Sequence, residues 1–147
     1  MNAQMKANHP DLSWLSDPEV FAVNRKDAHS DHLYYETMAE ARAEEKMPLR
    51  QCLNGTWYFS YAKNPSLRVK DFYKADFDCR SFDKIQVPGH IQTQGYDTMM
   101  YINTQYPWDG TEFLRPPEIS ESYNPVGSYV RYFEVEEALK GRPISIS

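Results

Sequence analysis

The sequence predicts a mainly β domain, the first part of a jelly-roll β-sandwich, preceded by an extended and short-helical N-terminal arm. Hydrophobic side chains alternate along residues 53–61 and 128–135, which is typical of strands. Prolines and glycines repeatedly interrupt the chain between these segments. About four strands can be counted, whereas a sandwich generally has about seven or eight. We therefore expect an arm in residues 1–50 and an incomplete sandwich in residues 51–147, with its remaining strands beyond residue 147.

The arm differs in pattern from the rest of the chain. Asp17-Pro18 and the residues after it predict an extended stretch, which has three apolar anchor residues: Val20, Phe21 and Val23. Residues 31–46 have a helix-forming composition, with Ser30 or Asp31 as N-cap and Pro48 as a stop. The apolar stripe of that helix is narrow: Leu33, Tyr34, Met38 and Ala41. Because such an arm cannot bury itself, we expect it to dock on other domains or on another subunit; a mobile tail is the alternative.

The first β element after the arm is LNGTWYFSYA, residues 53–62. Its alternation places three aromatic side chains on one face: Trp57, Phe59 and Tyr61. The opposite face receives Tyr58, Ser60 and Ala62. A turn at Asn64-Pro65-Ser66 leads into a crossing loop, and residues 84–87 form a short strand that Pro88 ends.

The last third of the chain alternates between irregular and extended structure. Residues 109–124 contain Pro116-Pro117 and predict a loop. The clearest strand spans residues 128–135, and neither of its faces is purely polar. A helical turn at residues 136–140 ends at Gly141, and Ile144 and Ile146 are expected to open one more strand.

Composition argues against several functions. The 147 residues have a net charge of −5 and a sequence pI of about 5.3, so no basic stripe is available for nucleic acid. No signal peptide and no membrane-spanning run is visible, which predicts a cytoplasmic protein without membrane contact. In that setting Cys52 and Cys79 are expected to be reduced thiols rather than a disulfide.

One long loop, residues 87–107, has a composition that suits a sugar ligand. It follows a strand stopped by Pro88-Gly89 and runs to Pro107. Aromatic rings can cover the C–H face of a sugar, and here they are Tyr96, Tyr101, Tyr106 and the adjacent Trp108. Neutral amides can pair with hydroxyl groups, and the loop offers Gln92, Gln94, Asn103 and Gln105. The alternative is an Ω-type loop whose tyrosines pack back onto the body of the domain.

Several ordered motifs carry a family resemblance. The runs PGHIQTQGYD, MYINTQYP and NPVGSYVRYFEV, together with LNGTWYFSY, resemble the N-terminal sugar-binding domain of the large bacterial β-galactosidases of glycoside hydrolase family two. The resemblance covers roughly residues 53–147 and implies a galactose-binding-like β-sandwich. In that family the asparagine of the Y-x-N-x-x-Y-P stretch binds substrate, which implies this role for Asn103. Tyr101, His90 and Asp97 are further substrate-binding candidates in the same loop.

No catalytic or metal-binding residue is assigned to this chain. Glycoside hydrolysis needs two carboxyl groups on rigid elements across the glycosidic bond. The spacing of the carboxylates near the loop identifies no such pair: Asp97, Asp109, Glu112 and Glu118. His29 and His32 have no further ligand at a familiar metal-site spacing. The resemblance implies that the catalytic residues lie on a (β/α)₈ barrel, and that magnesium and a monovalent cation are bound, mostly outside these 147 residues.

The resemblance therefore implies the N-terminal part of an enzyme. The full protein would hydrolyse terminal non-reducing β-D-galactose from β-galactosides with retention, and would be a homo-oligomer. Its partners would be the galactoside and the remaining domains of the same enzyme. Two alternatives from other classes are a non-catalytic carbohydrate-binding module and a structural segment that completes a partner chain.

Overall fold

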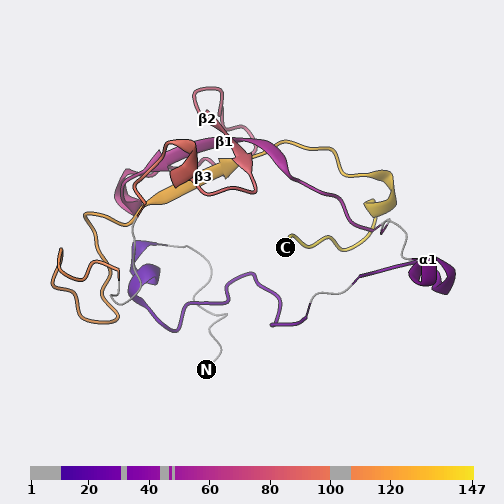
Figure 1. The fold of residues 1–147 in the computed structure, drawn as a ribbon, viewed down its shortest axis with the longest axis horizontal. Coiled ribbons are helices and arrows are strands. Elements are labelled where there is room, and N and C mark those ends of the chain that lie inside the picture. Colours follow the sequence, from indigo (N-terminus) through magenta and orange to yellow (C-terminus); the bar gives the residue numbers. More distant parts are fainter. Residues whose placement is uncertain (1–10, 31–32, 44–46, 48, 100–106) are drawn as a thin grey trace.

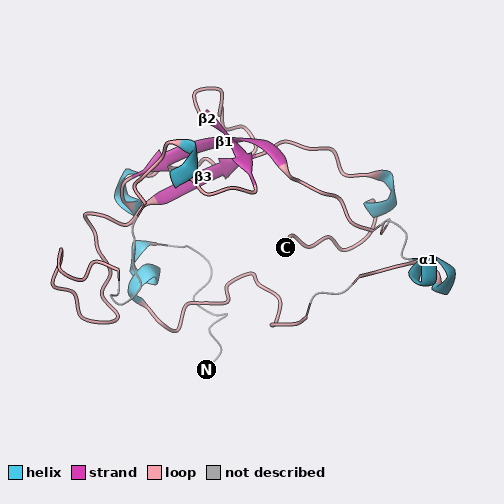
Figure 2. Cartoon of the chain, in the orientation of Figure 1, coloured by secondary structure: helices cyan, strands magenta, loops and turns pink. Residues whose placement is uncertain are grey.

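The computed structural model describes residues 11–30, 33–43, 47, 49–99 and 107–147. Its centre is one antiparallel three-stranded sheet in the order β2-β1-β3 (Figure 1), with β1 at Gly55–Ala62, β2 at Asp83–Val87 and β3 at Val126–Val130. The helical elements of the described chain are short (Figure 2): α1 (Met38–Ala43), η2 (Leu12–Ser16), η3 (Pro65–Leu67), η4 (Gln92–Gln94) and η5 (Glu137–Leu139). The mainly β class is confirmed. The jelly-roll connectivity stays a prediction.

Strand β1 forms the core because it pairs on both edges. Phe59 lies opposite Asp83 in β2 and Tyr129 in β3, and its side chain is 0% exposed. The predicted aromatic face of β1 is confirmed: the ring of Tyr129 lies 6.4 Å from that of Trp57 and 4.8 Å from that of Phe59, measured between centroids. Ile85, opposite Trp57 in β2, is also buried. Burial of such side chains is the main force that holds a small sheet together.

Strand β3 is shorter than the predicted strand at residues 128–135. It begins at Val126 and ends at Val130. After Val130, hydrogen bonds to the backbone at residues 134 and 136 come from a side chain and not from a neighbouring strand. The amide of Gln51 donates to the Glu134 carbonyl (2.7 Å) and accepts from the Glu136 N–H (3.0 Å). The Arg131 guanidinium meanwhile donates to the carbonyl of Leu53 (2.7 Å), which lies just before β1. Alternation alone could not reveal these contacts between distant residues.

The helix of the arm begins later than predicted. Thr37 precedes α1, and its hydroxyl accepts a hydrogen bond from the Glu40 N–H (3.2 Å). The Glu40 carboxylate reaches back to the N–H groups of Glu36 and Thr37 (3.1 and 3.2 Å). This is a capping box, which satisfies N–H groups that lack a partner within the helix. Ser30, a predicted N-cap, therefore does not cap α1; the alternative N-cap, Asp31, lies outside the described residues.

The C-terminal segment is only partly as predicted. The helical turn at residues 136–140 is present as η5, and Gly141 after it has a positive φ of 73°. The strand expected at Ile144 and Ile146 was wrong: these residues lie in no strand, and both are exposed. A strand needs a hydrogen-bonded neighbour, and within the described residues no segment pairs with this one.

The arm lies apart from the sheet and exposes several of its apolar side chains, although the predicted anchors Val20 and Val23 are half-buried. Its described residues between η2 and α1 lie on the opposite side of the view from the sheet (Figure 1), and Phe21 among them is 70% exposed. Leu33 and Met38 are exposed as well. One ion pair, 2.5 Å between the Arg142 guanidinium and the Glu36 carboxylate, connects the C-terminal segment to the residues before α1. Cys52 and Cys79 are both free, as expected.

Candidate functional site

The loop after β2 is bound back onto that strand by one glutamine. The Gln94 carboxamide accepts from the Gln86 N–H (2.7 Å) and donates to the Gln86 carbonyl (3.0 Å). These backbone groups lie on the edge of β2 that does not face β1, since β1 pairs with its other edge. The side chain of Gln94 thus bonds the edge as a neighbouring strand would. Gln94 is one of the amides that the loop's composition suggested as a hydrogen-bond partner for a sugar. Its carboxamide is instead hydrogen-bonded to the backbone of Gln86.

Gly89 makes this contact possible, because a Cβ at that position would lie 2.6 Å from Gln94 Nε2 and 3.0 Å from the Gln86 carbonyl oxygen. We expect Gly89→Ala to break the two bonds and to destabilise the loop by about 1 kcal/mol. Hydrogen exchange of peptides that contain Gln86 measures this cost. In the Gln94→Ala background the same substitution should cost clearly less, and an equal cost in both backgrounds would contradict the contact.

One tyrosine ring packs the loop onto the aromatic face of β1. The Tyr96 ring centroid lies 4.7 Å from that of Phe59 and 6.3 Å from that of Tyr61. Burial, and then a hydrogen bond to Asp83, raise the pKa of Tyr96. The Ω-type alternative therefore holds for Tyr96, which packs onto the body of the domain.

Asp97 follows directly and connects the loop to a distant segment. Its carboxylate accepts a hydrogen bond from the Tyr123 hydroxyl. That bond is the largest cause that raises the pKa of Tyr123. Burial, and then the Asp97 charge, raise the pKa of Tyr61. Asp97 is a binding candidate whose carboxylate already has tyrosine partners, which fits a structural role.

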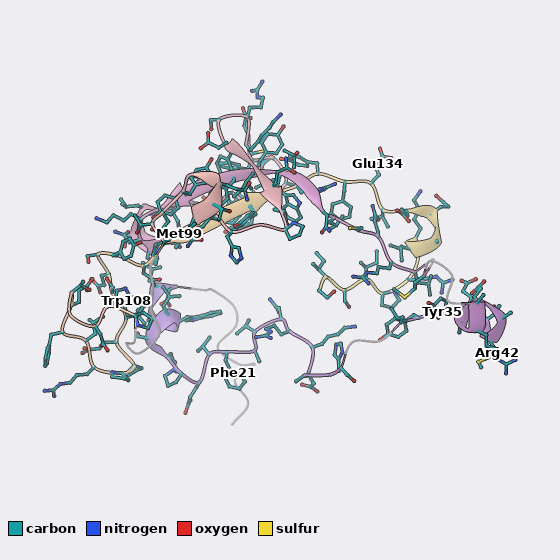
Figure 3. All side chains as sticks on the ribbon, in the orientation of Figure 1. Phe21, Tyr35, Arg42, Met99, Trp108 and Glu134 are labelled. Carbon is teal, nitrogen blue, oxygen red and sulfur yellow. The ribbon has the colours of Figure 1, made fainter. Side chains whose placement is uncertain are left out.

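Trp108 lies on the other side of residues 100–106 and reaches the same tyrosine. Its indole N–H donates to the Tyr123 carbonyl oxygen at 2.6 Å. Figure 3 shows Met99 and Trp108, which flank those residues, at the same end of the molecule. Tyr123 therefore bonds to residues on both sides of the segment 100–106, which contains two of the substrate-binding candidates, Tyr101 and Asn103.

Of the other three predicted site residues, the structure describes only His90. His90 is exposed, and its carbonyl accepts a hydrogen bond from the Thr93 hydroxyl (2.9 Å). Tyr101 and Asn103 lie outside the described residues. Sequence reasoning missed the roles of Gln94 and Tyr123. Their partners are 8 to 26 residues away in the chain, and no local pattern identifies such contacts.

The acidic residues beside the loop are bound locally. Glu112 accepts hydrogen bonds from the Ser120 hydroxyl (2.5 Å) and the Ser122 hydroxyl (2.8 Å), and these lower its pKa. A general acid in glycoside hydrolysis needs the opposite shift, a raised pKa. The Glu118 carboxylate accepts from the Arg115 N–H (2.9 Å). Glu112 is thus held in its ionised form by the serines and is unsuited to proton donation.

The described residues contain no cluster of three or more histidine, cysteine, aspartate or glutamate side chains placed to hold a metal ion. They also contain no helix with the length and hydrophobicity that crossing a membrane requires.

A mainly β domain with an aromatic, amide-rich loop braced on its sheet fits a carbohydrate-binding domain. Comparison with known families agrees, since residues 50–144 match the model of the glycosyl hydrolases family 2, sugar binding domain. The chain belongs to this family.

Relatives that match over most of the chain are named β-galactosidases. The protein with this name from Clostridium acetobutylicum is 58% identical over 140 residues, which are 95% of this chain and 16% of that protein. The one from Halalkalibacterium halodurans is 57% identical over 139 residues, 95% of this chain and 14% of its own length. A β-galactosidase large subunit from Leuconostoc lactis is 45% identical over 154 residues, which are 97% of this chain and 24% of that subunit. The chain thus spans between a seventh and a quarter of the length of these relatives.

Proposed function

We propose that this chain is the N-terminal part of a β-galactosidase that hydrolyses terminal non-reducing β-D-galactose residues in β-galactosides. The observation that carries the proposal is the identity of 58% with a protein of that name, across 95% of the chain. The match to a sugar binding domain of glycosyl hydrolases agrees with it. The reaction is a retaining double displacement, in which one carboxylate attacks the sugar and a second carboxyl group transfers the proton.

The chain's own contribution is substrate binding, through Asn103. Its amide donates to and accepts from galactose hydroxyl groups, which would otherwise lose their hydrogen bonds to water on binding. The support from the described residues is indirect. Before the segment that contains Asn103, the loop is bonded to the sheet through Gln94 and packed on it through Tyr96. On the two sides of that segment, Asp97 and Trp108 both bond to Tyr123. Fixed ends reduce the entropy that a binding loop loses when it takes up its ligand.

The catalytic carboxyl groups and the cations belong to other residues of the full-length polypeptide. Glu112 beside the loop has a lowered pKa, which does not fit a general acid. Magnesium and a monovalent cation would be bound mostly outside these 147 residues. We therefore assign no step of the reaction to a metal held by this chain.

The arm docks on another surface, either a further domain of the same polypeptide or a second subunit of a homo-oligomer. Apolar side chains exposed along it support this, with Phe21 at 70% and Met38 at 68%. This feature also favours the second candidate function, a structural segment that completes a partner chain. A partner-dependent cooperative melt of the isolated chain would select that candidate.

The test compares the full-length enzyme, expressed from the complete coding sequence, with residues 1–147 alone. We expect the full-length enzyme to hydrolyse lactose and to release β-galactose first, as NMR of the fresh product shows, whereas the chain alone turns over no galactoside. Turnover by the isolated chain, or an inactive full-length enzyme, would contradict the proposal. Saturable galactose binding by the isolated chain with an inactive full-length enzyme would indicate a carbohydrate-binding module.

A further inference from the structure

The described sheet has two outer edges, and β2 forms one of them. Its neighbour β1 pairs with one side of β2, so the backbone groups on the other side lie at the margin of the sheet. An open edge presents unpaired N–H and C=O groups, which pair readily with an extended segment of another molecule. Native proteins therefore protect their edge strands, and β2 is expected to carry such protection.

The backbone groups that face outward from β2 belong to Lys84 and Gln86. Gln94 bonds to both backbone groups of Gln86 from the outer side, at 2.7 and 3.0 Å. Backbone direction alternates along an antiparallel strand, so Lys84 also faces outward, whereas Ile85 faces β1, opposite Trp57. The edge thus has two sets of hydrogen-bonding groups, and Gln94 occupies one set.

That one set is enough to prevent β2 from pairing with the β2 of a second copy. Two copies related by a twofold axis at Ile85 would place Gln86 of each copy opposite Lys84 of the other. Every hydrogen bond between these pairs would use the N–H or the C=O of Gln86. Both groups are already bonded to Gln94, so the pairing cannot form while Gln94 is in place.

Other registers of the same pairing meet either Gln94 or a charge. A register centred on Gln86 needs the same two backbone groups. A register centred on Lys84 places the two lysines directly opposite each other, and like charges in that position are destabilising. Lys84 lies opposite Tyr58 in β1, and its ammonium is 5.9 Å from the centre of that ring. The bonds of Gln94 and the charge of Lys84 thus act on different registers of one edge.

Local contacts fix both glutamines in the positions that this bonding needs. The Gln86 side chain donates to the Thr56 hydroxyl oxygen at 2.8 Å, which ties Gln86 to β1. The backbone N–H of Gln94 donates to the Ile91 carbonyl at 3.1 Å, within the turn of η4. The absence of a side chain at Gly89 leaves room for the Gln94 carboxamide.

We propose that Gln94 is an edge cap: it keeps the β2 strands of two copies of this chain from pairing, and so prevents the protein from associating through this edge of the sheet. The role concerns contacts between molecules and goes beyond the bracing of the loop. It is independent of the proposed function, because the cap acts whether or not the loop binds a sugar.

The test is Gln94→Ala in the full-length protein, followed by hydrogen exchange at single-residue resolution. At low protein concentration the Gln86 amide should exchange at least about tenfold faster than in the parent protein, because its acceptor is removed. As the concentration rises, the Lys84 amide should exchange at least about tenfold more slowly, and the mean molar mass from light scattering should increase. Lys84 is the decisive residue, since a loosened loop alone would not protect its amide.

Two further variants serve as controls. Gln92→Ala removes the same group from the first residue of η4, but Gln92 does not bond to Gln86, so the mass and the Lys84 amide should stay as in the parent protein. Gln94→Glu separates an open edge from a loosened loop. Its carboxylate can accept from the Gln86 N–H but cannot donate to the carbonyl, and it places like charges at the edge of both copies. It should loosen the loop without causing association.

Gln94→Met covers the case in which the alanine variant does not fold, as judged by amide exchange across β1. It removes both bonds and keeps a flexible side chain of similar length. Concentration-dependent protection of Lys84 in Gln94→Ala or Gln94→Met, and in neither control, would support the cap. The proposal is overturned if the folded variant does not associate, if either control associates equally, or if both substitutions unfold β1, which would make Gln94 a residue needed for folding.

Discussion

Replacing Phe59 with alanine is expected to destabilise the sheet by about 3 to 5 kcal/mol, the usual cost of removing a buried phenylalanine side chain. Phe59 is 0% exposed and lies in the central strand, opposite residues of both neighbouring strands. Its ring also supports Tyr96 in the loop, at 4.7 Å between centroids. The substitution therefore leaves a cavity at the point where the sheet and the loop meet.

Native-state hydrogen exchange measures this effect in the full-length enzyme. Amides of residues 55–62 should exchange about a hundredfold faster or more in Phe59→Ala. Phe113→Ala is the control, since it makes the same chemical change at a side chain that is 93% exposed. It should alter exchange in β1 by less than about threefold. If both variants behave alike, Phe59 is not the centre of the core.

Much of the sheet is predictable because its pattern is local. Alternation in β1 gave the correct faces, and Pro88 marked the end of β2 correctly, because proline cannot donate to a strand ladder. Both signals depend on the residue itself and on its immediate neighbours. They apply before any tertiary contact forms.

Two of the errors share one physical cause, which is that side chains from elsewhere in the sequence bond the backbone. β3 ends at Val130, and the segment after it bonds to the amide of Gln51. Gln94 bonds the free edge of β2 in a similar way. A glutamine that bonds a strand edge has the same local sequence signature as one that binds a sugar, so the loop's composition could not separate the two roles.

The candidate site is also difficult to predict, because its contacts join residues that are far apart in the sequence. Composition drew attention to the loop, but its bracing depends on Tyr123, which is 26 residues from Asp97 and 15 from Trp108. Tyr123 stands in a segment predicted only as a loop beside the strand. The residues that hold a binding loop are thus harder to predict than the polar residues that the loop presents.

Asn103→Ala is the functional substitution with the largest expected effect. If Asn103 binds galactose as proposed, removing its amide deletes hydrogen bonds to the sugar and weakens transition-state binding by about 1 to 3 kcal/mol, which lowers kcat/KM of the full-length enzyme roughly 5- to 150-fold. Steady-state kinetics with lactose and with o-nitrophenyl β-galactoside measure this loss. Because the contact is to the galactose ring and not to the leaving group, both substrates should lose by a similar factor.

Asn54→Ala is the matched control, since Asn54 is exposed, directly precedes β1 and loses the same amide group. It should leave kcat/KM within about twofold of the parent value. Asn103→Asp tests the chemistry further: it keeps the acceptor and removes the donor, so it should recover part of the loss if the asparagine accepts from a hydroxyl group. Unchanged kinetics in Asn103→Ala would reject the binding role, and the family resemblance of this loop would then carry no information about how the enzyme holds galactose.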